Sequence, residues 1–503
     1  MRTPVPSLPS PLPEVEVTAA ARRGLPVVVL ARTGDDDAAL LGPGGADLDP
    51  EWAAAVGLTG KAGEVHTAAT HGAGIRWVAG IGEGEPQHWR KAGAALVRAF
   101  EARAEKDADA GRRVTKALQL TLPPEAGADE VAELVLGVSL GGYRYLVTGK
   151  AAKPRLRTLR LVAGDQGQLE LLREAVSRAS KLAAGTSTTR DLGNAPSNVK
   201  DPAWLANTAV KLAAQLPGLK VDVRDETWLA AQGFGGVLAV GAGSGPERPP
   251  RFVELTWHPK AAKGPHIALV GKGITFDTGG ISIKPADGMH LMRTDMCGGA
   301  AVIAALVTIA RLGLPVRVTG LVPLAENHVS GSSYRPGDIV RHYDGQTTEV
   351  SNTDAEGRMV LADAMGYAVK RVRPDLMVDV ATLTGAMKIS LGVRTGGLFA
   401  SDDDLAARII AAGERCAEAW WRMPLLADLE EGVVSEIADW RQCPPGPGGI
   451  TAALFLREFT AGLPWAHLDI AGPARSDKTY DEIVPGATGF ATRTLVELVA
   501  SYA

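Results

Sequence analysis

Short, mostly apolar runs alternate with longer helical patterns from about residue 169 to the end of the chain, and this alternation constrains the fold most. Runs such as His266 to Val270 and Leu376 to Val380 are typical of strands buried on both faces. Helical patterns separate them, for example at Pro202 to Gln215 and at Gly299 to Leu312. Strands that alternate with helices of this length predict a mostly parallel sheet with helices on both faces. In such sheets ligands bind beyond the carboxyl ends of the strands.

The same patterns define the expected elements of this region. Strands are predicted at Leu219 to Val223, Arg251 to Thr256, His266 to Val270, Val316 to Val322, Leu376 to Val380 and Ala466 to Ile470. Helices are predicted at Leu169 to Ala184, Pro202 to Gln215, Gly299 to Leu312, Val360 to Arg371 and Asp404 to Trp421.

The N-terminal third alternates in the same way on a smaller scale. Its predicted strands and helices are Leu25 to Leu30, Ile75 to Ile81, Gln87 to Lys106 and Ala128 to Gly137. A chain of 503 residues exceeds one ordinary core, and Lys150 to Gln168, rich in Lys, Arg and Gly, is the best linker candidate. We therefore expect a small N-terminal α/β domain over residues 1–165. A larger α/β catalytic domain, with a mixed or mostly parallel sheet, should follow over 166–503.

Composition and charge argue against several classes of function. The formal net charge is −4 and the charges are mixed along the chain, so the dense basic face of a nucleic-acid-binding protein is not expected. The sequence has no run of about 18 uninterrupted apolar residues, so we expect no membrane span. The N-terminus lacks the basic and apolar regions of a signal peptide. The three cysteines are far apart and form no CxxC pair, which argues against a disulfide framework. We expect a cytoplasmic protein.

A glycine-rich segment with several charged residues follows the strand predicted to end at Val270. It carries Lys272, Asp277, Lys284 and, slightly further on, Asp295. Glycines at a strand end permit tight turns and close backbone approach. A charged surface loop is the alternative reading of this segment. A phosphate-binding loop is disfavoured because the Walker spacing GxxxxGK[ST] is absent.

A second acidic segment lies at 352–358, with the sequence NTDAEGR. In extended chain Asp354 and Glu356 point to the same side, but such a pair alone is a weak signal. Together the two segments offer four carboxylates, which cannot all stay ionised without compensation. Two divalent cations supply that compensation, and oxygen-rich ligands suit Mg, Mn or Zn. Lys272 could then serve as a neutral amine ligand, because burial beside cations lowers the pKa of a lysine.

These segments resemble a known family. NTDAEGR stands at 352–358, the pattern GKGITFD-x-GG-x-x-x-K at 271–284, and the segment M-x-x-D-M at 292–296. Further matching segments lie at 190–196, 334–338, 381–386, 465–472 and 486–490. Because these motifs occur in order over about residues 170–500, the chain closely resembles the leucyl aminopeptidase family, also called cytosol aminopeptidases.

The resemblance implies a metallo-exopeptidase with two divalent ions, Mn²⁺ or Zn²⁺, that share a water. Its substrates would be peptides with a free N-terminus, from which it would hydrolyse leucine and other, mainly apolar, residues. The metal ligands would be Lys272, Asp277, Asp295, Asp354 and Glu356. Lys284 would be catalytic near the substrate carbonyl, and so would Arg358, which in this family holds a bicarbonate ion. The substrate-binding positions would be Met292, Asn352, Thr382, Leu383 and Gly385.

The resemblance further implies a homohexamer, with active sites that face an interior cavity. Some family members have acquired DNA-binding or regulatory roles, and this is the main alternative function. An inactive scaffold and a related dipeptidase are further alternatives. The departures at Asp439-Trp440 and at 444–449 leave the preferred side chain open. For His467 and Asp469, which lie inside a strand-like run, a satisfied core pair is favoured over a catalytic role.

Overall fold

The computed structural model describes residues 8–35, 38–70, 74–147 and 155–503. The chain forms two compact units. One comprises Pro9–Ser187 with Asp477–Pro485, and the other comprises Thr188–Ser476 with Gly486–Ala503. Helix α4 (Leu169–Asn194) begins in the first unit and ends in the second.

The N-terminal unit is built on a seven-stranded sheet in the order β1-β7-β6-β2-β5-β4, with β3 paired to β2. The pairs from β1 to β5 are parallel, while β3 and β4 run antiparallel to their neighbours. The elements are β1 (Glu14–Thr18), β2 (Val27–Thr33), β3 (Ala39–Leu41), α1 (Pro50–Ala55), β4 (Val65–Thr70), β5 (Gly74–Gly80), α2 (Pro86–Asp109), β6 (Ala117–Thr121), α3 (Ala128–Gly141) and β7 (Thr158–Val162). Both predicted strands and both predicted helices of this region are present.

The linker predicted over Lys150 to Gln168 is wrong for the part that the structure describes. Thr158–Val162 forms β7, which lies between β1 and β6. Leu159 and Leu161 are fully buried, while Arg160 between them pairs with Glu16 at 2.6 Å. Arg160 occupies an outward position of a period-two strand pattern. Residues 150–154 lie outside the described residues.

The larger unit contains a nine-stranded sheet in the order β17-β16-β19-β15-β10-β12-β9-β8, with β11 paired to β12. Its centre, β19-β15-β10-β12, is parallel, as the sequence predicts. Antiparallel pairs flank it, β12 with β9 and β19 with β16. The strands are β8 (Leu219–Arg224), β9 (Arg251–Trp257), β10 (His266–Gly271), β11 (Gly273–Asp277), β12 (Arg317–Asn327), β15 (Leu376–Ala381), β16 (Thr395–Ala400), β17 (Ala419–Arg422) and β19 (Trp465–Asp469).

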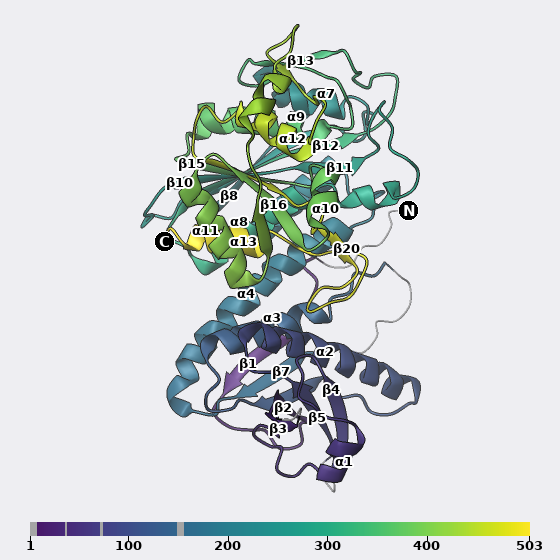
Figure 1. The fold of residues 1–503 in the computed structure, drawn as a ribbon, viewed down its shortest axis with the longest axis vertical. Helices are drawn as coiled ribbons and strands as arrows, with labels where there is room; N and C mark the ends of the chain where they lie inside the picture. Colours follow the sequence, from purple (N-terminus) through teal and green to yellow (C-terminus); the bar gives the residue numbers. More distant parts are fainter. Residues whose placement is uncertain (1–7, 36–37, 71–73, 148–154) are drawn as a thin grey trace. The chain divides into compact units, whose positions relative to one another are not determined.

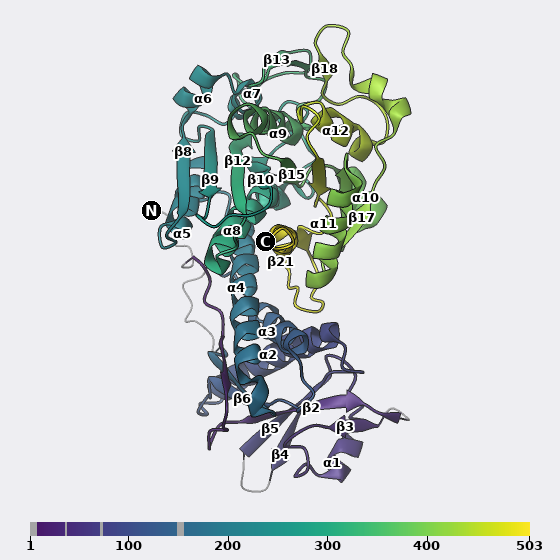
Figure 2. The same ribbon diagram turned by 90° about the vertical axis from the view of Figure 1, so that its left-hand side faces the viewer.

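Helices cover both faces of this sheet, which confirms the predicted α/β fold class (Figures 1 and 2). One layer consists of α5 (Pro202–Ala213), α8 (Cys297–Leu312), α11 (Asp403–Cys416) and α13 (Thr492–Ala500). The other consists of α7 (Gly235–Gly241), α9 (Glu356–Tyr367) and α12 (Gly448–Arg457). In Figure 1, α7, α9 and α12 lie above the strands, and α8, α11 and α13 lie below them.

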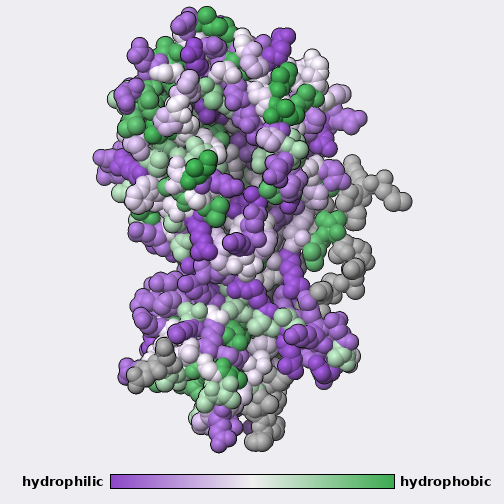
Figure 3. Space-filling model, turned by 45° about the vertical axis from the view of Figure 1, so that its right-hand side comes forward, coloured by the Kyte–Doolittle hydropathy of each residue, from purple (hydrophilic) through white to green (hydrophobic). Residues whose placement is uncertain are grey.

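The segment Met289–Leu312 contains α8 and is long and apolar enough to cross a membrane by length and composition. However, 83% of its apolar window is buried inside the fold. Such burial is typical of a helix in the core of an α/β layer, where apolar residues occupy the whole circumference. Among the described residues drawn in Figure 3, hydrophobic side chains are scattered and do not form one broad patch.

The helix predicted over Asp404 to Trp421 ends earlier than expected. It stops at Cys416, and Ala417 adopts a left-handed backbone with φ of 52°. The chain then turns into the edge strand β17, which carries both tryptophans. Trp420 is buried against Phe490, with ring centroids 4.9 Å apart, whereas Trp421 is 63% exposed. The predicted helix therefore does not include the two tryptophans, and only Trp420 packs on the core.

Candidate metal centre

The first glycine-rich segment joins β10 to β11 at the carboxyl end of the parallel strands. β10 ends at Gly271, and Lys272 is followed by β11, which ends at Asp277. Lys272 is almost completely buried, and its stem packs against the backbone of Gly357. A Cβ atom at residue 357 would lie 2.7 Å from Lys272 Cε, so a larger residue there would displace the lysine side chain. The two predicted segments thus meet at this contact.

The second segment brings its two acids to Asp277. One carboxylate oxygen each from Asp277, Asp354 and Glu356 can be chosen so that all three lie within 4.8 Å of one another. Asp277 and Glu356 are buried, and Asp354 is half-buried. Asp354 lies in a turn and Glu356 is the first residue of α9. The chain is not extended at this pair, so the turn and not a strand period brings the two acids together.

Two lysines bridge the four predicted acids. Lys272 Nζ lies 2.9 Å from Asp295 Oδ1 and 2.7 Å from Glu356 Oε1. Lys284 Nζ lies 2.8 Å from Asp277 Oδ2 and also pairs with Asp354. All six residues therefore belong to one cluster, in which two ammonium groups face four carboxyl groups.

The excess of acids has electrostatic consequences. Burial, together with the charge of Glu356, raises the pKa of Asp277 to about 7. Burial also raises the pKa of Asp295 well above its ordinary value. Burial alone lowers the pKa of Lys272, but the carboxylates of Asp295 and Glu356 outweigh it and raise that pKa instead. With only protein groups around it Lys272 is thus an ammonium, and its expected role as a neutral ligand depends on added cations.

The donor set fits divalent cations. Asp295 Oδ2 is buried and has no hydrogen-bond partner among the residues that the structure describes. A buried, unsatisfied carboxylate oxygen is costly unless a cation or proton meets it. Carboxylate oxygens at the carboxyl ends of strands are ligands that Mn²⁺ and Zn²⁺ accept.

Asn327, at the end of β12, was missed by the sequence reasoning. Its Nδ2 donates to Asp277 Oδ1 at 2.8 Å and to the Thr353 carbonyl at 3.0 Å. The Gly279 amide donates to the same Asp277 oxygen at 2.8 Å. These donors orient the Asp277 carboxylate, as partners of metal ligands commonly do. The signal available in the sequence was the pair of polar residues, Glu326 and Asn327, directly after the apolar stretch of a long buried strand.

Three of the predicted substrate-binding residues lie in or near the loop that follows β15. Thr382 Oγ1 donates to Asp295 Oδ1 at 2.7 Å, and the Thr382 carbonyl accepts from Lys272 at 3.0 Å. The Leu383 amide donates to Asp469 at 3.3 Å. Gly385 begins α10 (Gly385–Leu391). Asp469 thus holds this loop. His467 pairs instead with Asp379 at 2.6 Å, so His467 and Asp469 are not a pair with each other.

Gln442 links the remaining predicted residues and was also missed. Arg358 is buried in α9, and its Nη1 donates to the Gln442 carbonyl at 2.6 Å. The Gln442 side chain accepts from the Asn352 amide at 3.1 Å, while Asn352 Oδ1 accepts from the Asp354 amide at 2.9 Å. Met292 lies on the short helix η3 (Met289–Thr294), and its carbonyl accepts from the Asp295 amide at 3.1 Å.

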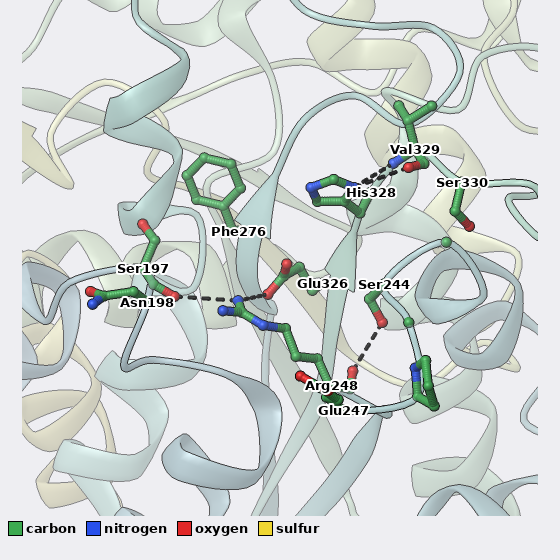
Figure 4. Close-up of a pocket in the computed structure, with 13 residues that line it drawn as sticks. Ser197, Asn198, Ser244, Glu247, Arg248, Phe276, Glu326, His328, Val329 and Ser330 are labelled. Carbon is green, nitrogen blue, oxygen red and sulfur yellow. Dashed lines mark hydrogen bonds and ion pairs between the residues drawn. The ribbon is translucent and has the colours of Figure 1, made fainter. Parts of the chain in front are cut away.

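A separate cavity of about 650 Å³ is lined in part by residues at the ends of β11 and β12 (Figure 4). Phe276 and Glu326 line it, and in each strand they precede the residue that faces the acidic cluster. Successive strand residues point to opposite faces, so this cavity and the cluster use opposite sides of the same strands. In the cavity Glu326 pairs with Arg248 at 2.7 Å. None of the predicted site residues lines it.

The buried acidic cluster lies at the carboxyl ends of parallel strands, which is where α/β enzymes bind their ligands. The catalytic-domain pattern of the cytosol aminopeptidase family matches residues 187–496. The chain belongs to this family, as the sequence motifs indicated, and is a peptidase.

The similarity to known proteins extends beyond the catalytic domain. A probable cytosol aminopeptidase of Leifsonia xyli is 40% identical over 514 residues, which covers 97% of this chain and 99% of the relative. One of Syntrophotalea carbinolica is 42% identical over 420 residues, with 82% and 79% covered. Among solved structures, a mutant of tomato leucine aminopeptidase has a TM-score of 0.85 at 30% identity, covering 99% of this chain and 98% of its own. The bottromycin maturation enzyme BotP in complex with Mn has a TM-score of 0.81 at 39% identity, with 94% and 98% covered.

Proposed function

We propose that this peptidase is a metal-dependent leucyl aminopeptidase, which removes leucine and other, mainly apolar, residues from the free N-termini of peptides. The observation that carries the proposal is the convergence of Asp277, Asp354 and Glu356 within 4.8 Å. The similar structures of a leucine aminopeptidase and of an enzyme in complex with Mn support it.

The predicted ligands divide between two ions. Asp277, Glu356 and Asp354, the last also through its carbonyl, would hold one ion. Lys272, Asp295 and the shared Asp277 and Glu356 would hold the other. Bound Mn²⁺ or Zn²⁺ supplies Lewis acidity and lowers the pKa of a shared water towards neutrality. The carboxylates around Lys272 favour its charged ammonium form. Two bound divalent cations would instead repel a positive charge at this position and so favour the neutral amine.

The protein's own groups would orient the substrate and move protons. Lys284 is half-buried at the edge of the cluster, where its ammonium can stabilise negative charge that develops on the substrate carbonyl. Arg358, buried and positioned by Gln442, would hold bicarbonate as a proton carrier. The substrate would lie against Met292, Asn352, Thr382, Leu383 and Gly385.

The remaining predictions accompany this proposal. We propose a cytoplasmic homohexamer whose catalytic domain spans residues 166–503 and whose N-terminal domain spans 1–165. A DNA-binding or regulatory role remains the alternative, and no feature of the described residues favours it over peptide hydrolysis.

Removal and return of metal tests the proposal directly. After dialysis against a chelator, the protein should lose hydrolysis of leucyl p-nitroanilide, and Mn²⁺ or Zn²⁺ should restore it. N-acetyl-leucyl p-nitroanilide, which lacks a free amine, should not be hydrolysed under either condition. Activity that survives complete chelation, or that ignores the blocked amine, would falsify the proposed function.

A further inference from the structure

Lys200 is a lysine whose whole side chain is buried, with 0% exposure. It follows helix α4 and precedes α5. Its ammonium donates to the carbonyls of Leu192 at 2.8 Å, Gly193 at 2.9 Å and Arg293 at 2.5 Å. Met296 Sδ lies 3.5 Å from the same nitrogen. The ammonium therefore lies inside a cage of three carbonyl oxygens and a thioether.

A lysine in this position is costly. Lysine is almost never fully buried unless it is paired, and the four acceptors around Lys200 are three carbonyls and a thioether rather than carboxylates. Burial lowers the pKa of Lys200 to about 7. The last turn of α4 favours the positive charge of Lys200. Leu192 and Gly193 lie at the negative end of the helix dipole, where the carbonyls of the last turn have no partner within the helix. The ammonium has three N–H donors, enough to satisfy all three carbonyls.

The other side of the cage belongs to the metal centre. Arg293 and Met296 flank Asp295, so Lys200 contacts the chain on both sides of this acid. The Asp295 carboxylate in turn contacts Lys272 and Thr382. Asp295 lies in the short connection between η3 and α8, which belongs to neither helix and has no regular backbone hydrogen-bond pattern of its own. Lys200 thus ties this connection to the end of α4.

We propose that Lys200 is a positioning residue, which fixes the segment 293–296 and thereby directs the Asp295 carboxylate to the second metal ion. This inference rests on the proposed function, because it concerns the same metal site. Within the described part of the chain, the hydrogen-bond acceptors of Lys200 include no proposed ligand oxygen and no proposed substrate-binding residue. Its effect must therefore appear in metal affinity before it appears in the chemical step.

The test compares Lys200→Met with the wild-type protein. Methionine keeps most of the side-chain volume but leaves the three carbonyls without their donor. We expect Mn²⁺ affinity, measured by competition with a fluorescent chelator, to fall about 10- to 100-fold, as for other partners that orient metal ligands. Saturating Mn²⁺ should restore most of kcat. Lys200→Gln keeps two N–H donors and should lose less affinity; it replaces the methionine variant if that variant does not fold.

Glu418→Gln is the matched control for lost stability. Glu418 is buried in the same unit and accepts hydrogen bonds from Ala491, from Thr494 N and from Thr494 Oγ1. It should lower the thermal midpoint without changing Mn²⁺ affinity. Wild-type affinity in both Lys200 variants, or an equal loss of affinity in Glu418→Gln, overturns the inference and leaves the proposed function intact. A wild-type protein that binds neither Mn²⁺ nor Zn²⁺ overturns both.

Discussion

Glu356→Gln should reduce the hydrolysis of leucyl amides by about a thousandfold or more, because it removes an acid shared by both proposed ions. Glu356 lies within 4.8 Å of two other acids and 2.7 Å from Lys272. Burial alone raises the pKa of Glu356, but Lys272 and Lys284 outweigh burial and lower it. Glu356 is therefore ionised even before a metal binds, whereas the pKa of Asp277 is about 7. The negative charge of Glu356 is therefore the one that the centre can least replace.

The measurement pairs activity with metal content. Glutamine has nearly the shape of glutamate, so the packing of α9 should persist and the circular dichroism spectrum should not change. Metal content after gel filtration should fall, with an affinity loss above the roughly 100-fold seen for outer partners of ligands. Glu326→Gln is the matched control. It removes a buried carboxylate at the end of β12 that faces the cavity of Figure 4 and pairs with Arg248. A Glu356→Gln variant with normal metal content would contradict the ligand assignment.

Patterns confined to one segment were the most predictable part of this protein. The central strands β10, β15 and β19 stand within one or two residues of their predicted positions, because buried parallel strands are continuous apolar runs. The acids of both motifs converge because Asp277 ends β11, while Asp354 and Glu356 lie just before and at the start of α9, the helix that covers the same sheet and leads into β15. That convergence follows from topology, which alternating strands and helices predict.

The missed features depend on distant contacts. Asn327, Gln442 and Lys200 act through backbone groups far away in sequence, such as Thr353, Ala355 and Arg293. Nothing in their own neighbourhoods marks those partners. The turn at Ala417 was missed for a different reason. A non-glycine residue at φ of 52° is rare, and the alanine-rich sequence around it favours continuing the helix.

The effect of Lys284 should differ in kind from that of Glu356. Lys284 pairs with Asp277 and Asp354, so its ammonium contacts carboxylates that are also proposed to hold the metal ion. A divalent ion must compete with this charge for the same oxygens. Lys284→Met should therefore leave Mn²⁺ affinity unchanged or higher. It should nevertheless lower turnover about 100-fold, since losing one donor to a developing oxyanion commonly costs about 3 kcal/mol.

Kinetics separate these two roles of Lys284. If its ammonium acts on the transition state alone, kcat and kcat/KM for leucyl p-nitroanilide should fall by the same factor at saturating Mn²⁺. Lys388→Met removes an exposed lysine from α10, the helix that follows the loop after β15. This control should leave both constants unchanged. A Lys284→Met variant that retains full turnover would exclude a role in the chemical step. A variant that loses metal would instead make Lys284 part of the binding site, because removing a competing ammonium cannot by itself weaken the attraction between carboxylates and a cation.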